Sequence, residues 1–277
     1  MPNQFEFETL LLIGATSGIG EEMARQYHAA GKKVIISGRR IERLNRVKSE
    51  LPGAEAIQMD IQALDSIPNA IGQAFDQFPS IDAIIIVAGQ QNYYNFNSGQ
   101  PPLVPGKGAP NTSDINSEIT TNLTGPIILT REIIKYASSG PRGSKPFTLA
   151  YVTSGLAYVP VPIFPIYCAS KAALHYFIVS MRAQLVDTKI RLVEIVPPYV
   201  QTELDSHHQD VVHAAMGKNT PPGQEVGDYV ASVLQGMGKT DEDGKPPTLV
   251  AEGFPLIMAN AWVNAFGPLA KNFGLKL

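Results

Sequence analysis

The chain has 277 residues, of which 44% are hydrophobic and 17% charged, and its formal net charge at pH 7 is -3. This apolar content excludes an intrinsically disordered chain, which lacks the apolar surface needed to offset the entropy of ordering. The slightly acidic balance argues against a nucleic-acid partner, because binding a phosphate backbone needs a basic surface. The single cysteine, Cys168, excludes an intrachain disulfide and is consistent with a reducing compartment.

The hydropathy pattern gives no indication of a membrane or secretory function. No segment approaches the roughly 20 apolar residues that cross a bilayer. The first apolar run, residues 10–13, is too short for a signal-peptide core and has Glu6 and Glu8 before it. We therefore expect a cytoplasmic protein without a membrane partner.

Short apolar runs alternate with amphipathic stretches along the whole chain. Strands are expected at residues 10–13, 34–37, 56–59, 83–88, 147–153, 191–196 and 248–251. Helices are expected at residues 20–30, 41–50, 67–78, 113–136, 167–186 and 225–237, with an apolar tail from residue 254 that is broken at Gly267-Pro268. Apolar strands that trade places with helices are typical of βαβ units on a parallel sheet covered on both faces. The pattern predicts an α/β, doubly wound Rossmann fold in one domain, residues 1–277, with a seven-stranded, mainly parallel sheet.

Two regions depart from this alternation. Residues 90–112 are rich in Asn, Gln, Gly and Pro without a helical period, so we expect a loop on the substrate side. Residues 203–277 are expected to form a lid and a C-terminal region. Loops this long inside a compact domain are usually functional or disordered.

A glycine-rich segment joins the first expected strand to the first helix. Its glycines allow a tight turn, the approach of backbone to a pyrophosphate, and close packing of helix on strand. The helix N-terminus adds unpaired N–H groups and partial positive charge. An ordinary glycine turn is the alternative, but the position after the first strand favours a dinucleotide site. The residues expected at the phosphates are Gly14, Thr16, Ser17, Gly18, Ile19 and Gly20.

The residues after the second strand indicate which dinucleotide is bound. An acidic residue at this position would bind the adenosine ribose of NAD, but the chain has Ser37-Gly38-Arg39-Arg40. Arg39 offers a planar guanidinium that matches phosphate oxygens. Solvated arginines at a helix start are the alternative, although that position disfavours cations. We therefore expect NADP(H), with Ser37, Arg39 and Arg40 among its contacts.

The candidate catalytic residues begin with Tyr167 and Lys171, which share a face of a helix at a spacing of four. A free tyrosine is a poor proton carrier at neutral pH, but a nearby lysine cation favours its phenolate form. This spacing also arises by chance. Two further residues argue against chance: Ser154 at the end of a strand can hydrogen-bond a carbonyl oxygen, and Asn122 stands within a predicted helix, where asparagine is unfavourable.

With Asp60 after the third strand and Ala88-Gly89 after the fourth, these motifs resemble the short-chain dehydrogenase/reductase family from about residue 10 to about residue 203. The resemblance implies that Tyr167 donates a proton in reduction or accepts one in oxidation. It implies that Lys171 holds the nicotinamide ribose and lowers the pKa of Tyr167, that Ser154 polarises the carbonyl, and that Asn122 positions a water in a proton relay. The further cofactor contacts that it implies are Asp60, Ile61, Ala88, Gly89, Asn122, Tyr167, Lys171, Pro197, Val200 and Thr202.

Three positions depart from the family's usual pattern. Ile13 replaces a threonine before the glycine loop, Ile86-Val87 replaces two asparagines, and Pro198 replaces a glycine. The first two put the bracing of the cofactor loop in question, and the third removes a backbone N–H. None of them changes a proton-transfer residue.

Apolar side chains dominate the segment between Ser154 and Tyr167 and favour a bulky apolar ketone or alcohol, although core packing explains most of them equally well. These side chains are Leu156, Tyr158, Val159, Val161, Ile163 and Phe164, with Tyr199 and Trp262 as further candidate walls. His207, His208 and His213 show no ligand spacing, so no metal is expected.

We expect an NADP(H)-dependent carbonyl reductase or alcohol dehydrogenase that acts on a small molecule. A non-redox isomerase or cyclase on the same fold, or a catalytically silent NADP(H) sensor, are the alternatives. The two long helices at residues 113–136 and 167–186 resemble the association surface of the family, which implies a homodimer or homotetramer.

Overall fold

A computed structural model describes residues 7–97, 108–204, 223–240 and 244–275 of the protein. Its sheet has seven strands, all parallel, in the order β3-β2-β1-β4-β5-β6-β7. The strands are β1 (Thr9–Ile13), β2 (Lys33–Gly38), β3 (Glu55–Gln58), β4 (Ala83–Ile86), β5 (Phe147–Val152), β6 (Ile190–Val196) and β7 (Leu249–Ala251). Because β1, β4 and β5 are buried along their whole length, their sequences are continuously apolar or nearly so.

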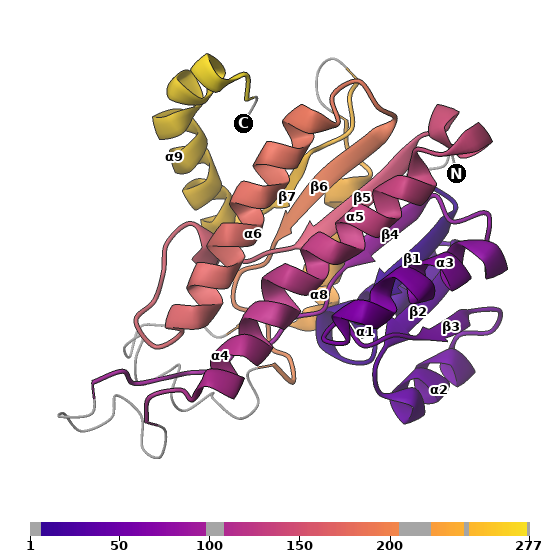
Figure 1. The fold of residues 1–277 in the computed structure, drawn as a ribbon, viewed down its shortest axis with the longest axis horizontal. Coiled ribbons are helices and arrows are strands. Elements are labelled where there is room, and N and C mark those ends of the chain that lie inside the picture. Colours follow the sequence, from indigo (N-terminus) through magenta and orange to yellow (C-terminus); the bar gives the residue numbers. More distant parts are fainter. Residues whose placement is uncertain (1–6, 98–107, 205–222, 241–243, 276–277) are drawn as a thin grey trace.

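Helices cover both faces of the sheet and divide the core in two (Figure 1). Alternate residues of one strand point to opposite faces, so Leu10 and Leu12 join one core while Leu11 and Ile13 join the other. The first core is completed by α1 (Gly18–Ala29), α2 (Ile41–Glu50) and α8 (Val226–Met237). The second is completed by α3 (Ile67–Gln77), α5 (Gly125–Ala137) and α6 (Pro165–Gln184). This confirms the doubly wound Rossmann fold.

The strand order reverses at β1, which pairs with β2 on one side and with β4 on the other. At such a reversal the loops after adjacent strands diverge and open a crevice at the carboxyl edge of the sheet. Gly14 follows β1 with φ of +97°, and a Cβ atom there would lie 2.5 Å from the Ala88 backbone nitrogen. Only glycine therefore allows the two loops to approach each other this closely.

The continuous α-helix expected at residues 113–136 is corrected to three parts: α4 (Thr112–Ile119), a π-helical turn at Thr120–Thr124, and α5. The Gly125 N–H bonds to the Thr120 carbonyl, five residues back. Pro126 has no N–H that could bond to the carbonyl of Asn122 in an α-helical pattern. The π turn thus ends two residues before Pro126, which interrupts the hydrogen-bond ladder.

The expected break at Gly267-Pro268 is wrong, because α9 (Gly253–Ala270) continues through this pair. Pro268 lies in the last turn, where its missing N–H removes one hydrogen bond close to the helix end. Figure 1 shows α9 at the outer side of α6, away from the centre of the sheet. The helix carries no charged residue, and Phe254, Ile257 and Leu269 are exposed. Even so, no helix in the described part of the chain is long and apolar enough to cross a membrane.

Candidate active site

A cavity of about 1390 Å³ follows the carboxyl edge of the sheet from the glycine loop to α9. It brings together residues that lie far apart in the sequence. Eighteen of the predicted site residues line it: Gly14, Thr16, Ser17, Gly18, Ile19, Gly20, Arg39, Arg40, Asp60, Ile61, Ala88, Gly89, Ser154, Tyr167, Lys171, Pro197, Val200 and Thr202. Ser37 and Asn122 do not line it and lie behind its wall.

Ser37 acts through its backbone. Its side chain is fully buried, and its hydroxyl has no hydrogen-bond partner within the described ranges. Its carbonyl oxygen accepts the N–H groups of Gly14 and Ala15, each at 2.9 Å. Ser37 therefore anchors the start of the glycine loop.

The glycine loop leads directly into the N-terminus of α1. A Cβ atom at Gly20 would lie 2.2 Å from the Gly14 carbonyl oxygen, so the turn closes on itself only with glycine at that position. The N-cap residue, Ser17, makes no side-chain bond to the first turn of α1. The N–H groups of this turn are therefore available to an anion in the cavity.

The two arginines after β2 differ in their contacts. Arg40 donates from Nη2 to Thr16 Oγ1 at 2.8 Å and to Ser17 Oγ at 3.0 Å. Burial and the charge of Arg43 lower the pKa of the Arg40 guanidinium. Arg39 is exposed, and its guanidinium has no partner among the residues that the structure places. Arg40 thus braces the loop, while Arg39 remains available to an anionic ligand.

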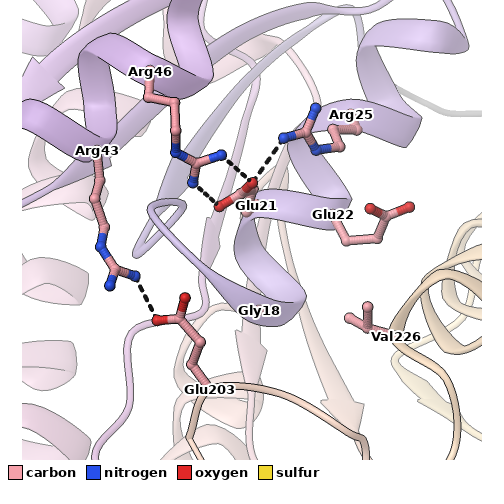
Figure 2. Close-up of a pocket in the computed structure, with 8 residues that line it drawn as sticks. All are labelled: Gly18, Glu21, Glu22, Arg25, Arg43, Arg46, Glu203 and Val226. Carbon is pink, nitrogen blue, oxygen red and sulfur yellow. Dashed lines mark hydrogen bonds and ion pairs between the residues drawn. The ribbon is translucent and has the colours of Figure 1, made fainter. Parts of the chain in front are cut away.

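A second cavity, of about 500 Å³, lies on the outer side of α1 and is lined by charged side chains (Figure 2). Glu21 accepts hydrogen bonds from Arg46 at 2.6 Å and from Arg25 at 2.8 Å. Arg43 pairs with Glu203 at 2.5 Å and joins α2 to the segment after β6. Figure 2 shows that these guanidinium groups point at carboxylates, so this cavity has little free positive charge.

Tyr167 and Lys171 lie one turn apart on α6, and both are almost fully buried. Lys171 Nζ lies 5.6 Å from the centroid of the Tyr167 ring and donates to the Val152 carbonyl oxygen at 2.9 Å. Burial lowers the pKa of Lys171 to about 8. The arrangement gives the phenol a nearby cation within an otherwise desolvated wall of the cavity.

Ser154 follows β5 and precedes a short 3-10 turn at Gly155–Ala157. Its Oγ accepts the Leu156 N–H at 3.1 Å. Because the oxygen acts as an acceptor in this bond, its own proton remains available to donate to a substrate oxygen.

Asn122 lies in the π turn and clamps the backbone of Gln90. Its Nδ2 donates to the Gln90 carbonyl at 2.8 Å and to Ser170 Oγ at 3.0 Å, and its Oδ1 accepts the Gln90 N–H at 2.8 Å. A Cβ atom at Gly89 would lie 3.6 Å from Lys171 Nζ and 3.7 Å from Asn122 Oδ1. The structure thus brings Asn122 close to Lys171, with its amide fully engaged, and the water-positioning role stays a prediction.

Many apolar side chains line the cavity beside Ser154 and Tyr167. Its lining includes Tyr93, Leu156, Val159, Val161, Phe164, Tyr199, Phe254, Pro255 and Met258. Tyr158, Ile163 and Trp262 do not line it; the Trp262 ring packs against His175 instead, with centroids 4.5 Å apart. Sequence reasoning named Trp262 of α9 but missed Phe254, Pro255 and Met258, because no local signal shows which face of a helix about 90 residues after Tyr167 returns to this wall.

The described residues contain no group of three or more His, Cys, Asp or Glu side chains that could hold a metal ion. His207, His208 and His213, and the greater part of the expected lid, fall outside them, as do residues 98–107 of the expected substrate loop.

Known proteins share this sequence pattern. The sequence model of the short chain dehydrogenase family matches residues 8–211. The uncharacterized oxidoreductase DltE of Bacillus subtilis is 32% identical over 203 residues, which cover 73% of this chain and 75% of that protein. The NADP-dependent 3-hydroxy acid dehydrogenase of Schizosaccharomyces pombe is 28% identical over 207 residues, covering 73% of this chain and 74% of that protein.

Solved structures share the fold. A short chain dehydrogenase of Burkholderia cenocepacia in complex with NADP superposes with a TM-score of 0.71 at 20% identity, covering 96% of this chain and 97% of that chain. The family match includes the glycine loop, Ser154 and the Tyr167–Lys171 pair that line the cavity. The protein therefore belongs to the short-chain dehydrogenase/reductase family.

Proposed function

We propose that this oxidoreductase is an NADP(H)-dependent carbonyl reductase or alcohol dehydrogenase for a bulky apolar substrate. The observation that carries the proposal is one cavity with two unlike halves. Its dinucleotide half has the glycine loop and an unpaired arginine, and its other half has an apolar wall beside Ser154, Tyr167 and Lys171.

The residues present fit a nicotinamide dinucleotide. Glycine at positions 14 and 20 lets the loop pack against Ala88 and close on itself at the cavity, and the first turn of α1 has N–H groups for the pyrophosphate. Arg39 supports the choice of NADP(H), since no carboxylate stands at residues 37–40 to repel a 2′-phosphate. Similar proteins use both cofactors: the fission yeast enzyme is NADP-dependent, whereas a Brucella melitensis reductase of similar fold was crystallised with NADH.

The chain's own residues perform the proton chemistry. The Ser154 hydroxyl donates a hydrogen bond to the substrate carbonyl oxygen and stabilises the negative charge that develops there. The Tyr167 phenol gives its proton to the same oxygen in reduction and takes it back in oxidation. Lys171 stabilises the phenolate through its charge. A bound nicotinamide supplies or accepts the hydride.

The surrounding residues orient and desolvate the reactants. Asn122 fixes Gln90 beside Gly89, and the Val152 carbonyl holds the Lys171 ammonium at the wall of the cavity. The apolar side chains around Tyr167 exclude water from the reacting carbon, which strengthens each electrostatic contact.

We further propose a cytoplasmic homodimer or homotetramer. The family resemblance implies association through α4–α5 and α6, and Tyr176 on α6 is an exposed aromatic residue that supports such a contact. The single cysteine supports a reducing compartment.

The test is NADPH oxidation with a panel of aryl and alkyl ketones, in the wild type and in Tyr167→Phe. We expect turnover of bulky apolar ketones and a loss of roughly 10²–10⁴-fold in kcat in the variant, with NADPH affinity retained. Unaltered turnover in Tyr167→Phe contradicts the catalytic role. Product formed without nicotinamide oxidation would indicate an isomerase or cyclase instead.

A further inference from the structure

A buried polar cluster lies directly behind Ser154. Glu194 on β6 is 1% exposed and His175 on α6 is 3% exposed. His175 Nδ1 lies 2.9 Å from Glu194 Oε2 and 3.1 Å from Oε1. The hydroxyl of Thr153, the residue before Ser154, donates to Glu194 Oε1 at 2.8 Å. Tyr158 Oη lies 3.4 Å from Oε2 of the same carboxylate.

This cluster is organised around the carboxylate. Three donors from three elements converge on Glu194, which satisfies a buried charge that would otherwise be strongly unfavourable. His175 Nδ1 faces both carboxylate oxygens, so the tautomer that is protonated at Nδ1 donates to Glu194. His175 Nε2 is buried and makes no hydrogen bond within the described residues, and the Trp262 ring packs edge-on against the imidazole. The imidazole is thus oriented mainly by Glu194, and Tyr158 Oη lies 3.3 Å from the same Nδ1.

The cluster connects α6, which carries Tyr167 and Lys171, with the end of β5, which leads into Ser154. His175 follows Lys171 by four residues and Tyr167 by eight, so the three side chains form one stripe on α6. Lys171 attaches this stripe to β5 through the Val152 carbonyl, and His175 attaches it to β6 through Glu194. Two attachments one turn apart fix both the rotation and the height of α6 over the sheet.

Stability alone does not explain a buried charge at this place. Replacing a buried ion pair with well-packed apolar residues is often neutral or stabilising, so such pairs are weak evidence for a stabilising role. Here the Glu194 carboxylate contacts Thr153, which precedes Ser154, and His175, which lies one turn after Lys171. The position of the carboxylate between these residues therefore favours a role in the site.

We propose that Glu194 is a positioning residue, which through Thr153 and His175 holds Ser154 and the Tyr167–Lys171 face of α6 in the geometry for proton transfer. The inference rests on the proposed carbonyl reduction for its kinetic readout. Displacing a reacting group by about 1 Å can lower the rate on the order of a hundredfold, so a small relaxation of either attachment has a measurable effect.

Paired variants at Thr153 and His175 test the proposal. Thr153→Val keeps the shape but removes the donor, and Thr153→Ser restores it. His175→Leu removes the Nδ1 donor, and His175→Asn restores an N–H at about the same place. With an aryl alkyl ketone from the panel, we expect kcat to fall about tenfold or more in Thr153→Val and His175→Leu, with NADPH affinity unchanged. We expect Thr153→Ser and His175→Asn to recover most of the kcat that Thr153→Val and His175→Leu lose.

The matched control is Thr130→Val. Thr130 on α5 is equally buried and makes a hydroxyl contact of 2.9 Å with Tyr151, which pairs with Glu194 in the β5–β6 register but has no hydrogen bond with the Glu194 cluster among the described residues. We expect it to lower thermal stability about as much as Thr153→Val and to leave kcat unchanged. An equal loss of kcat in Thr130→Val would overturn the proposal, because it would reduce the effect to general destabilisation.

Two further measurements separate this inference from the proposed function. In a Ser154→Ala background, Thr153→Val should have little further effect on kcat, and an undiminished loss would overturn the proposal. The phenolate absorbance that Tyr167→Phe removes needs no substrate, and its pH midpoint should rise in His175→Leu, because a loosened α6 holds the Lys171 charge less closely beside the phenolate. An unmoved midpoint overturns the inference even where no ketone is turned over.

Discussion

Lys171 and the arginines on the outer face of α1 and α2 are cations in opposite surroundings. The Lys171 side chain is buried, its ammonium donates to the neutral carbonyl of Val152, and no carboxylate pairs with it among the described residues. Arg25 and Arg46 are partly exposed and share the carboxylate of Glu21 (Figure 2). In the described part of the chain, Arg25 and Arg46 thus have a carboxylate partner, whereas the buried Lys171 has none.

This difference in pairing distinguishes cations that stabilise the fold from a cation that is placed for the reaction. Exposed ion pairs stabilise a protein by about 0–1 kcal/mol each. A buried cation without an anion destabilises it, which is why burial lowers the pKa of Lys171 to about 8. A site that keeps such a group gives up stability for a charge placed beside Tyr167.

The largest effect is expected from Lys171→Met. We expect kcat to fall at least about a hundredfold, because the phenolate loses its cation. Without the burial penalty, the variant without cofactor should be more stable than the wild type at pH 7, by up to the order of 3 kcal/mol. The folded-state pKa of Lys171 is lowered, so the penalty is fully present below about pH 8 and disappears as the pH rises toward the ordinary lysine value. Urea unfolding at pH 7 and pH 10 measures the difference, which should shrink at the higher pH.

Lys32→Met is the matched control for this comparison. The Lys32 side chain is similarly buried, but its Nζ lies 3.4 Å from Glu8. Removing it leaves a carboxylate without that partner, so we expect no gain in stability at pH 7. If Lys171→Met were no more stable than the wild type at either pH, the buried lysine would not carry the penalty described here.

Sequence reasoning found residues whose role follows from local spacing. Tyr167 and Lys171 share a helix face wherever the helix lies, and the glycine loop after a buried strand predicts its own turn. Continuous apolar runs placed most strand ends within one or two residues, as for β1 and β6.

The remaining features depend on tertiary packing. No local pattern shows that Phe254 and Met258 wall the cavity, since that requires α9 to fold back over Gly155, where a Cβ atom would lie 2.9 Å from the Met258 side chain. The contacts of Arg40 with Thr16 and Ser17 join segments more than 20 residues apart. The π turn at Asn122 also has no local signature, since Pro126 interrupts an α-helical and a π-helical ladder alike.

A smaller effect is expected at the two arginines after β2. Arg39→Ala should weaken NADPH about tenfold or more and leave NADH affinity unchanged, because its guanidinium is free for a 2′-phosphate. Arg40→Ala removes the braces on Thr16 and Ser17 and should weaken both cofactors by a similar factor. Fluorescence titration with each cofactor gives the four dissociation constants. Equal losses of both cofactors in Arg39→Ala would show that Arg39 does not contact the 2′-phosphate.

The smallest effect is expected at Glu21. Burial alone would raise the pKa of its carboxyl group, but hydrogen bonds from Arg46 and Arg25 lower it below the usual 4.5. The stability that these bonds contribute is therefore present above that pH and is lost as the pH falls. Arg46→Ala should lower the free energy of unfolding by less than about 1 kcal/mol at pH 7. Because Arg46 is partly exposed, most of this difference should vanish at about 1 M salt, where charges are screened within a few ångströms. A larger loss of unfolding free energy that does not depend on salt would contradict this prediction. It would mean that burial, and not the ion pair with Glu21, determines what Arg46 contributes to stability, as we infer for Lys171.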